Sequence, residues 1–233
     1  MRRTRRVSGS CLGLLIALAC HSSSREEVFD ANIPLHPHSG EPALASLHVE
    51  RASLLSGLAE QSEALPLRIA LWADGTLCWS GDLQHGGAPY SVTHVGASQA
   101  TEVLEKLRSI LDVRVGRAPS YVVPDSESSQ LAVLKGQQFL GMASSIEAFE
   151  RNPDLVATEH GVESLQGRDR GEVIAAQSGA HQRLRTSWGK AVEAFSSWIP
   201  PSGERLDEQA FEYVHWDARS GRGSSVAARG EAR

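Results

Sequence analysis

Cysteine is scarce in this sequence: Cys11, Cys20 and Cys78 are the only three in 233 residues. So few cysteines exclude the disulfide framework on which many small secreted domains depend. Hydrophobic residues make up 41% of the chain, which is enough for a packed core instead. Long apolar runs are also missing, since the best candidate, 7–19, is shorter than the roughly 20 residues of a membrane-spanning helix.

The sequence also lacks a basic patch. The formal net charge is −5, and removal of the four arginines among the first six residues lowers it by four to −9. An acidic domain does not suit electrostatic attraction to phosphate backbones or to anionic lipid. We therefore expect no nucleic-acid partner.

The first 20 residues have the order of an export signal. Four arginines lie within 1–6, an apolar run follows over 11–19, and small residues precede Cys20. The segment Ile16-Ala17-Leu18-Ala19-Cys20 resembles the lipobox of bacterial lipoproteins, and the resemblance covers this segment only. It implies cleavage before Cys20, lipidation of the Cys20 thiol, and a membrane anchor that holds the protein in the bacterial cell envelope, outside the cytoplasm. His21, in place of Asp, favours the outer membrane in a host with two membranes.

An ordinary secretory signal is the alternative. Ala17 and Ala19 also form an Ala-x-Ala cleavage site, which places the cut at the same bond and leaves Cys20 as a thiol. Cys20 could then pair with Cys78, and the protein would be a soluble secreted domain. If Cys20 is lipidated, only Cys78 remains in the mature chain and no intramolecular disulfide forms.

Composition divides the chain into four parts. We predict a signal peptide over 1–19, a flexible tether over 20–44, a single domain over 45–216 and a disordered tail over 217–233. His36 and His38 fall in the predicted tether, where we expect solvated linker side chains. A metal site needs three or four ligands in fixed geometry, so no metal ligand is assigned.

The predicted fold is α+β: an antiparallel β-sheet of two hairpins plus extra strands, packed by two principal helices. Asp74-Gly75, between β-prone runs, predicts a two-residue hairpin turn that places Trp72, Leu77 and Trp79 on one face. A second hairpin turns at Lys135-Gly136. Further strands are expected over 90–95, 121–123 and, as an edge strand, 211–216.

Apolar spacing predicts the helices. Ser98 precedes a helix with a stripe from Val103 to Leu111, and a second helix is expected over 172–199, before Pro200. Residues 44–58 show a looser helical spacing. The polar segment 155–171 is predicted to be a long loop.

No catalytic motif is complete. Ser187 and Lys190 have the S-x-x-K spacing of penicillin-binding proteins and β-lactamases, but the companion motifs of those enzymes are missing. Asp82, His85 and His94 flank the first hairpin and could converge in a metal or catalytic site, although solvated loop residues explain them equally well. No catalytic residue and no cofactor are assigned.

Two tryptophans are candidates for ligand contact. Trp72 and Trp79 could form an aromatic platform for a sugar or peptide if their face is open. The alternative is core packing against the 103–111 helix.

A small binding or interaction module of the envelope, with an envelope protein or small ligand as partner, accounts best for these features. The alternatives are an envelope hydrolase with an unrecognised site, and a structural or inhibitory lipoprotein that acts through an exposed sheet edge.

Overall fold

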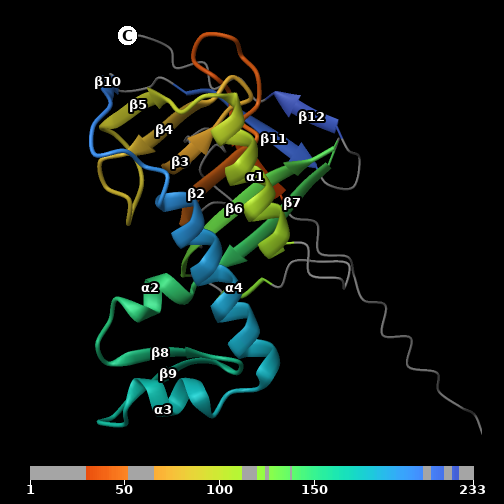
Figure 1. Ribbon diagram of the computed structural model, residues 1–233. Coiled ribbons are helices and arrows are strands. Elements are labelled where there is room, and N and C mark those ends of the chain that lie inside the picture. Colours follow the sequence, from red (N-terminus) through yellow and green to blue (C-terminus); the bar gives the residue numbers. More distant parts are fainter. Residues whose placement is uncertain are drawn as a thin grey trace, which may run out of the picture.

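The computed structural model describes residues 30–51, 66–111, 120–123, 126–136, 138–206, 211–217 and 222–225. The predicted signal peptide and Cys20 lie outside the described residues. Figure 1 shows a large sheet with helices across one face, and a smaller lobe beneath it.

The main sheet confirms the predicted α+β fold. Its seven strands have the order β10-β5-β4-β3-β2-β6-β7, and every neighbouring pair is antiparallel. Both predicted hairpins are present, as β3–β4 and β6–β7. The strands are β2 (Ala45–Arg51), β3 (Leu67–Leu71), β4 (Thr76–Ser80), β5 (Tyr90–His94), β6 (Glu127–Lys135), β7 (Gln138–Ser144) and β10 (Glu204–Leu206).

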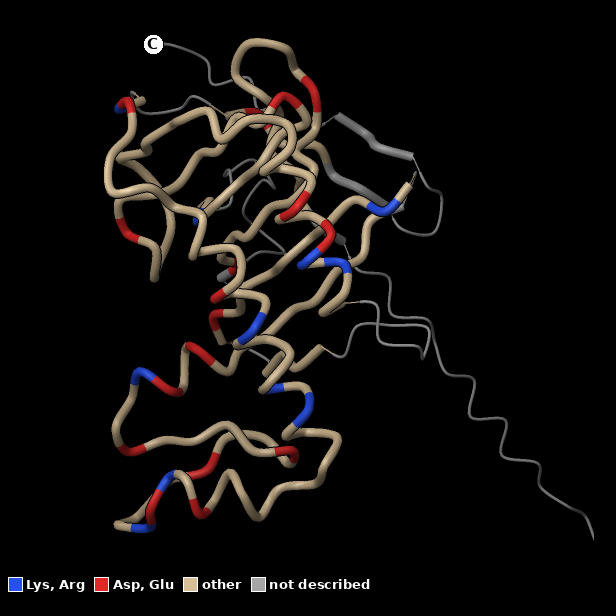
Figure 2. The backbone as a smooth tube through the Cα atoms, in the orientation of Figure 1, with Lys and Arg blue, Asp and Glu red and all other residues tan. Residues whose placement is uncertain are grey.

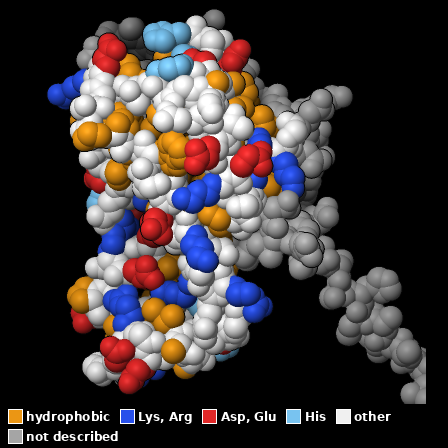
Figure 3. All heavy atoms as spheres, viewed as in Figure 1, with side chains coloured by type: hydrophobic (Ala, Val, Ile, Leu, Met, Phe, Trp, Pro, Cys, Tyr) orange, Lys and Arg blue, Asp and Glu red, His pale blue; other side chains and the backbone are white. Residues whose placement is uncertain are grey.

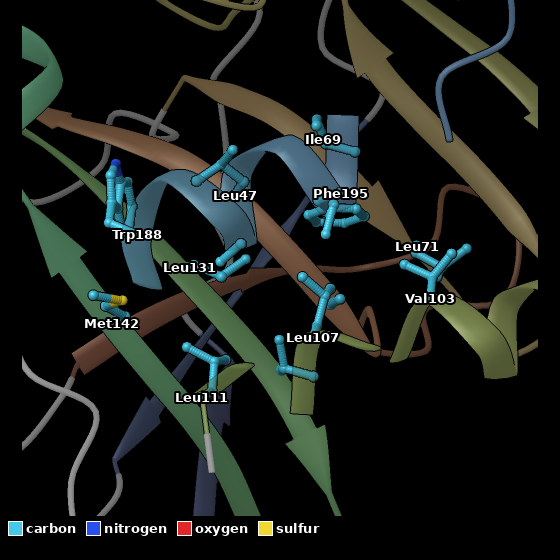
Figure 4. Packing of buried hydrophobic residues seen from close by; sticks show 14 of the residues in the cluster. Leu47, Ile69, Leu71, Val103, Leu107, Leu111, Leu131, Met142, Trp188 and Phe195 are labelled. Atoms are coloured by element: carbon cyan, nitrogen blue, oxygen red, sulfur yellow. The ribbon is translucent and has the colours of Figure 1, made fainter. Parts of the chain in front are cut away.

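Two helices, α1 (Ala97–Leu111) and α4 (Gly179–Ser196), cover one face of this sheet and pack against each other (Figure 1). The predicted stripe of α1 is buried from Val103 to Leu111, and Phe195 of α4 is fully buried beside it. Figure 4 shows these side chains meeting Leu47 and Leu131 of the sheet. Each buried side chain of this size stabilises the fold by about 1.5–3 kcal/mol. None of the described helices is long and apolar enough to cross a membrane.

A second layer, consisting of β1 (Asp30–Pro34), β11 (Tyr213–Asp217) and β12 (Arg222–Ser225), forms a three-stranded sheet of order β1-β11-β12. Ile33 of β1 is fully buried against the other face of the main sheet. The prediction of a flexible tether was therefore wrong for 30–44, and that of a disordered tail was wrong for 217 and for 222–225. The expected edge strand over 211–216 is instead β11, a central strand paired on both sides.

Strand β2 is an inner strand of the main sheet, between β3 and β6, where the sequence indicates a loose helical pattern. Ala45, Leu47 and Val49 are fully buried toward the helices and alternate with Ser46 and His48 on the other face. This alternation is the period of a β-strand. The leucines after Arg51, which produced the helical spacing, lie outside the described residues.

The lower lobe consists of α2 (Ile146–Glu150), β8 (Leu155–Thr158), β9 (Gly161–Ser164) and α3 (Arg170–Ala175). The β8–β9 hairpin replaces the loop predicted over 155–171. The single helix predicted over 172–199 is two helices, α3 and α4. The Ser178 side chain begins α4 by accepting a hydrogen bond from the His181 N–H.

The β3–β4 turn has three residues rather than two. Leu71 pairs with Leu77, and Trp72 N–H donates to the Thr76 carbonyl. Gly75 alone adopts positive φ, at +88°, as in a three-residue loop with a bulge. Trp72 and Trp79 consequently face opposite sides of the sheet, in two different clusters, so the prediction of one shared face was wrong.

Candidate functional site

A cleft of about 270 Å³ lies between the β4–β5 loop, residues 81–89, and α2 of the lower lobe. Its lining consists of Gln84 from the loop and Glu147, Glu150 and Arg151 from α2 and its C-terminal end. Figure 3 shows acidic and basic side chains side by side on the surface where the sheet meets the lobe.

Arg68 connects both walls of this cleft. It occupies a β-bulge in β3, where the register with β2 shifts between Leu47 and His48. Its Nε donates to the Leu83 carbonyl in loop 81–89, and its Nη1 donates to Glu147 Oε2 at 2.7 Å. Nη1 also reaches Ser129 Oγ at 3.1 Å. Because only 6% of Arg68 is exposed, this guanidinium fixes the loop and α2 from beneath.

Arg151 holds the outer part of the cleft. It forms an ion pair with Glu127 of β6. With the Gln84 amide oxygen turned toward the guanidinium, Gln84 accepts from Nε and Nη1, both at 3.2 Å. Loop 81–89 is thus linked to the C-terminal end of α2 across the cleft.

A third ion pair joins α2 to the long helix α4. Arg185 pairs with Glu150 and donates through Nη1 to the Ala157 carbonyl at 3.0 Å. Burial lowers the pKa of Arg185, and Glu150 opposes this shift; a guanidinium remains charged in either case. Three ion pairs therefore surround α2: Arg68–Glu147, Arg151–Glu127 and Arg185–Glu150. Figure 2 shows both signs of charge in this part of the backbone.

Loop 81–89 rests directly on the chain that enters β3. Gly86 has φ of +71°, and a Cβ there would lie 2.6 Å from the Pro66 carbonyl oxygen. The next N–H, of Gly87, donates to the Leu67 carbonyl. The buried Ser80 hydroxyl donates to the Gly87 carbonyl. The loop wall therefore has a defined backbone path.

Asp82 and His85, two of the predicted site residues, form a pair within this loop. Asp82 Oδ2 lies 2.8 Å from His85 Nδ1, and Oδ1 accepts from the backbone N–H groups of Gln84 and His85. The hydrogen bond from His85 lowers the pKa of Asp82 to about 2, so the carboxylate is ionised at neutral pH. Asp82 thus both stabilises the turn and orients the imidazole.

His94 does not join this pair. It lies opposite Thr76, at the far end of the β4–β5 hairpin, while the loop follows Ser80. The two ends of β4 are four residue steps apart, about 13 Å. The three residues named from the sequence therefore do not form one site.

His94 lies instead near Asp74, which also pairs with His36. The His36 ring accepts from the His38 N–H through Nδ1, which directs Nε2 toward Thr76 Oγ1 at 3.3 Å and Asp74 Oδ2 at 3.5 Å. Burial raises the pKa of Asp74, but hydrogen bonds from Thr76 and the nearby His36 and His94 outweigh it and lower this pKa. His36 is buried, so its prediction as a solvated linker residue was wrong.

Both candidate tryptophans belong to the core. Trp72 is 1% exposed, donates through Nε1 to the Glu41 carbonyl and stacks on Phe211. Trp79 is 7% exposed and packs beneath the helices. Neither side chain forms an open platform. Both pack in the core, as the alternative interpretation predicted, but only Trp79 lies on the side of the sheet that the helices cover. Cys78 is also buried, and burial raises the pKa of its thiol.

The residues of the cleft were not singled out from the sequence. Arg68 did carry a signal, because it is a charged residue inside the apolar run 67–71. A buried arginine requires an acidic partner. The identity of that partner, Glu147, could not follow from spacing, since it lies 79 residues further on.

Comparisons with protein families, with curated proteins and with solved structures found no match to this chain. Within the described part of the chain, no three His, Cys, Asp or Glu side chains are grouped so that they could hold a metal ion.

Proposed function

We propose that this protein is exported and lipid-anchored at Cys20, and that it acts in the cell envelope as a binding module whose ligand occupies the cleft between loop 81–89 and α2. The anchor is supported by the order of residues 1–20: four arginines, an apolar run and small residues before a cysteine. The ten peptide steps from Cys20 to Asp30 reach at most about 35 Å, so the domain stays close to the membrane surface.

The cleft is the observation that carries the binding role. Concave sites with a few fixed polar groups are where small ligands bind. Here Arg68 and Arg151 fix the two walls, so the lining groups are held in place before a ligand arrives. Preorganisation of this kind lowers the entropy cost of binding.

The donor and acceptor balance indicates the ligand's chemistry. The arginines direct N–H groups to protein acceptors, including Glu147, Glu150 and Glu127. Glu150 pairs through Oε1, and among the described residues its Oε2 has no hydrogen-bond partner. Its carboxylate is 42% exposed and faces the cleft. The ligand is accordingly a polar group with N–H donors, such as an ammonium or guanidinium group of an envelope protein or peptide.

The test is backbone NMR on the mature chain, with Cys20→Ser to keep it soluble. Three capped tripeptides with a central lysine, norleucine or glutamate are titrated in turn. We expect the lysine peptide alone to shift the amide signals of 82–87 and 146–151. Glu150→Gln should weaken this binding at least fivefold, whereas Glu193→Gln, on the exposed side of α4, should not. Shifts confined to other regions, or none at millimolar peptide, would contradict the cleft as the site.

A further inference from the structure

The second face of the main sheet carries a set of buried polar side chains that each have an unpaired atom. Ser46 and His48 of β2 are fully buried, and Gln130 of β6 is 8% exposed. Ser46 Oγ, both ring nitrogens of His48 and Gln130 Oε1 make no hydrogen bond. Buried polar groups are nearly always paired, so a group of three on adjacent strands requires an explanation.

This set lies on the face covered by the second layer. His48 is opposite Gln130 on β6 and Leu67 on β3, and cross-strand partners share a face. Leu67 and Ala132 belong to the cluster that packs against Ile33 of β1, with Tyr213 of β11 beside it. His48 is therefore on the sheet face that faces β1 and β11.

Among the described side chains, His48 has no ion pair that would stabilise an imidazolium. The carboxylate two residues further along the same strand, that of Glu50, accepts a hydrogen bond from the Gln130 amide and none from His48. The titratable groups in the adjoining cluster are Cys78, Tyr90 and Tyr213, and burial raises the pKa of each, which keeps them uncharged at and below neutral pH. Opposite the ring on β6, Gln130 Oε1 is a neutral acceptor.

We propose that His48 is an acid-sensitive latch: protonation of its buried ring loosens β1 and β11 from the second face of the seven-stranded sheet. The inference is independent of the ligand cleft, which lies on the helix side. Loosening would also lengthen the chain between Cys20 and the sheet, because β1 is the described strand nearest the predicted anchor.

The direction of the effect follows from linkage. Burial lowers the pKa of His48 from 6.5 to about 4, with Gln130 acting in the opposite direction. A histidine whose pKa is depressed in the folded state stabilises that state above pH 6.5, and this stabilisation is lost as the pH falls from 6.5 toward 4. With these two values, the equilibrium for opening increases about 20-fold between pH 7 and pH 5.

Hydrogen exchange with mass spectrometry on the full chain tests the latch, after correction for the intrinsic pH dependence of amide exchange. We expect protection of 30–34 and 213–217 to fall about 20-fold from pH 7 to pH 5, with the helix side of the sheet unchanged. His48→Leu and His48→Gln should both abolish this fall. His94→Gln, at an exposed position, should retain it.

Three results would overturn the proposal. These are unchanged protection of the wild-type second layer at pH 5, an equal fall in both His48 variants, and a fall spread evenly over α1 and the main sheet. His181 provides an internal comparison, since burial lowers its pKa too. Protonation of His181 would lower exchange protection at the start of α4 and in the lower lobe. This loss of protection should persist in the His48 variants.

Discussion

Arg68 of β3 and Glu147 of α2 form a two-point ion pair beneath the candidate cleft, with Nη1–Oε2 and Nη2–Oε1 distances of 2.7 and 3.4 Å. The pair joins the centre of the main sheet to the first turn of a five-residue helix. So short a helix is not stable by itself. The ion pairs that hold it therefore position the cleft lining.

The two members of this pair should contribute unequally to stability. Glu147→Ala leaves the buried Arg68 guanidinium without a counter-charge, and we expect a loss of about 3 kcal/mol in unfolding free energy. Arg68→Met should lower the unfolding free energy by less, because the Glu147 carboxylate that it leaves unpaired is 29% exposed and can be solvated. Urea unfolding of both single variants and the double variant measures the difference and the coupling.

An exposed pair serves as the control. Arg168 and Glu163 are 52% and 39% exposed, so Glu163→Ala should lower the unfolding free energy much less than Glu147→Ala. If Glu147→Ala lowered the unfolding free energy as little as Glu163→Ala does, Arg68 would not depend on Glu147 as its partner.

Adjacent glycines in loop 81–89 offer a matched comparison. Gly86 and Gly87 both have positive φ, and alanine at either position costs about 1 kcal/mol for that backbone conformation. At Gly86 the added Cβ would also lie 2.6 Å from the Pro66 carbonyl oxygen, whereas Gly87 has nothing within 4 Å. Gly86→Ala should therefore lower the thermal midpoint clearly more than Gly87→Ala and weaken ligand binding in the cleft. Equal effects of the two substitutions would argue against a loop fixed on β3.

The boundary between α3 and α4 should depend on one hydroxyl. Ser178 caps α4, so Ser178→Ala should destabilise the protein by about 1 kcal/mol. Ser187→Ala, inside the same helix, should be neutral or slightly stabilising because alanine has the higher helix propensity. Chemical denaturation of the two variants tests this. Ser187 would need reconsideration as a functional residue if its alanine variant lost ligand binding without loss of stability.

Local patterns were sufficient for much of the sheet and for α1. The β6–β7 turn at Lys135-Gly136 and the stripe from Val103 to Leu111 depend on neighbours in sequence, and both were predicted correctly. The turn at Asp74 was placed correctly, but its length was not. The Asp74 carboxylate accepts from the Thr76 N–H and hydroxyl, which favours three loop residues and reverses the predicted facing of Trp72.

Long-range pairing accounts for the larger errors. Asp30–Pro34 is polar and proline-containing, yet it becomes a strand because it pairs with Tyr213–Asp217 at the other end of the chain. Arg68 likewise finds its partners 15, 61 and 79 residues away, in a loop, a strand and a helix. Spacing within a single sequence contains no information about such partners. The candidate site is built from these contacts, which is why only its loop was anticipated, through Asp82 and His85.

The membrane anchor is the central claim about where this protein works. Intact-mass analysis of the mature protein from membrane and soluble fractions, with Cys20→Ser as the control, tests it most directly. We predict a membrane-bound chain that begins at Cys20 and carries a lipid-sized mass increment, which the control lacks. A soluble chain with an unmodified Cys20 would contradict the anchor and identify the protein as a secreted domain.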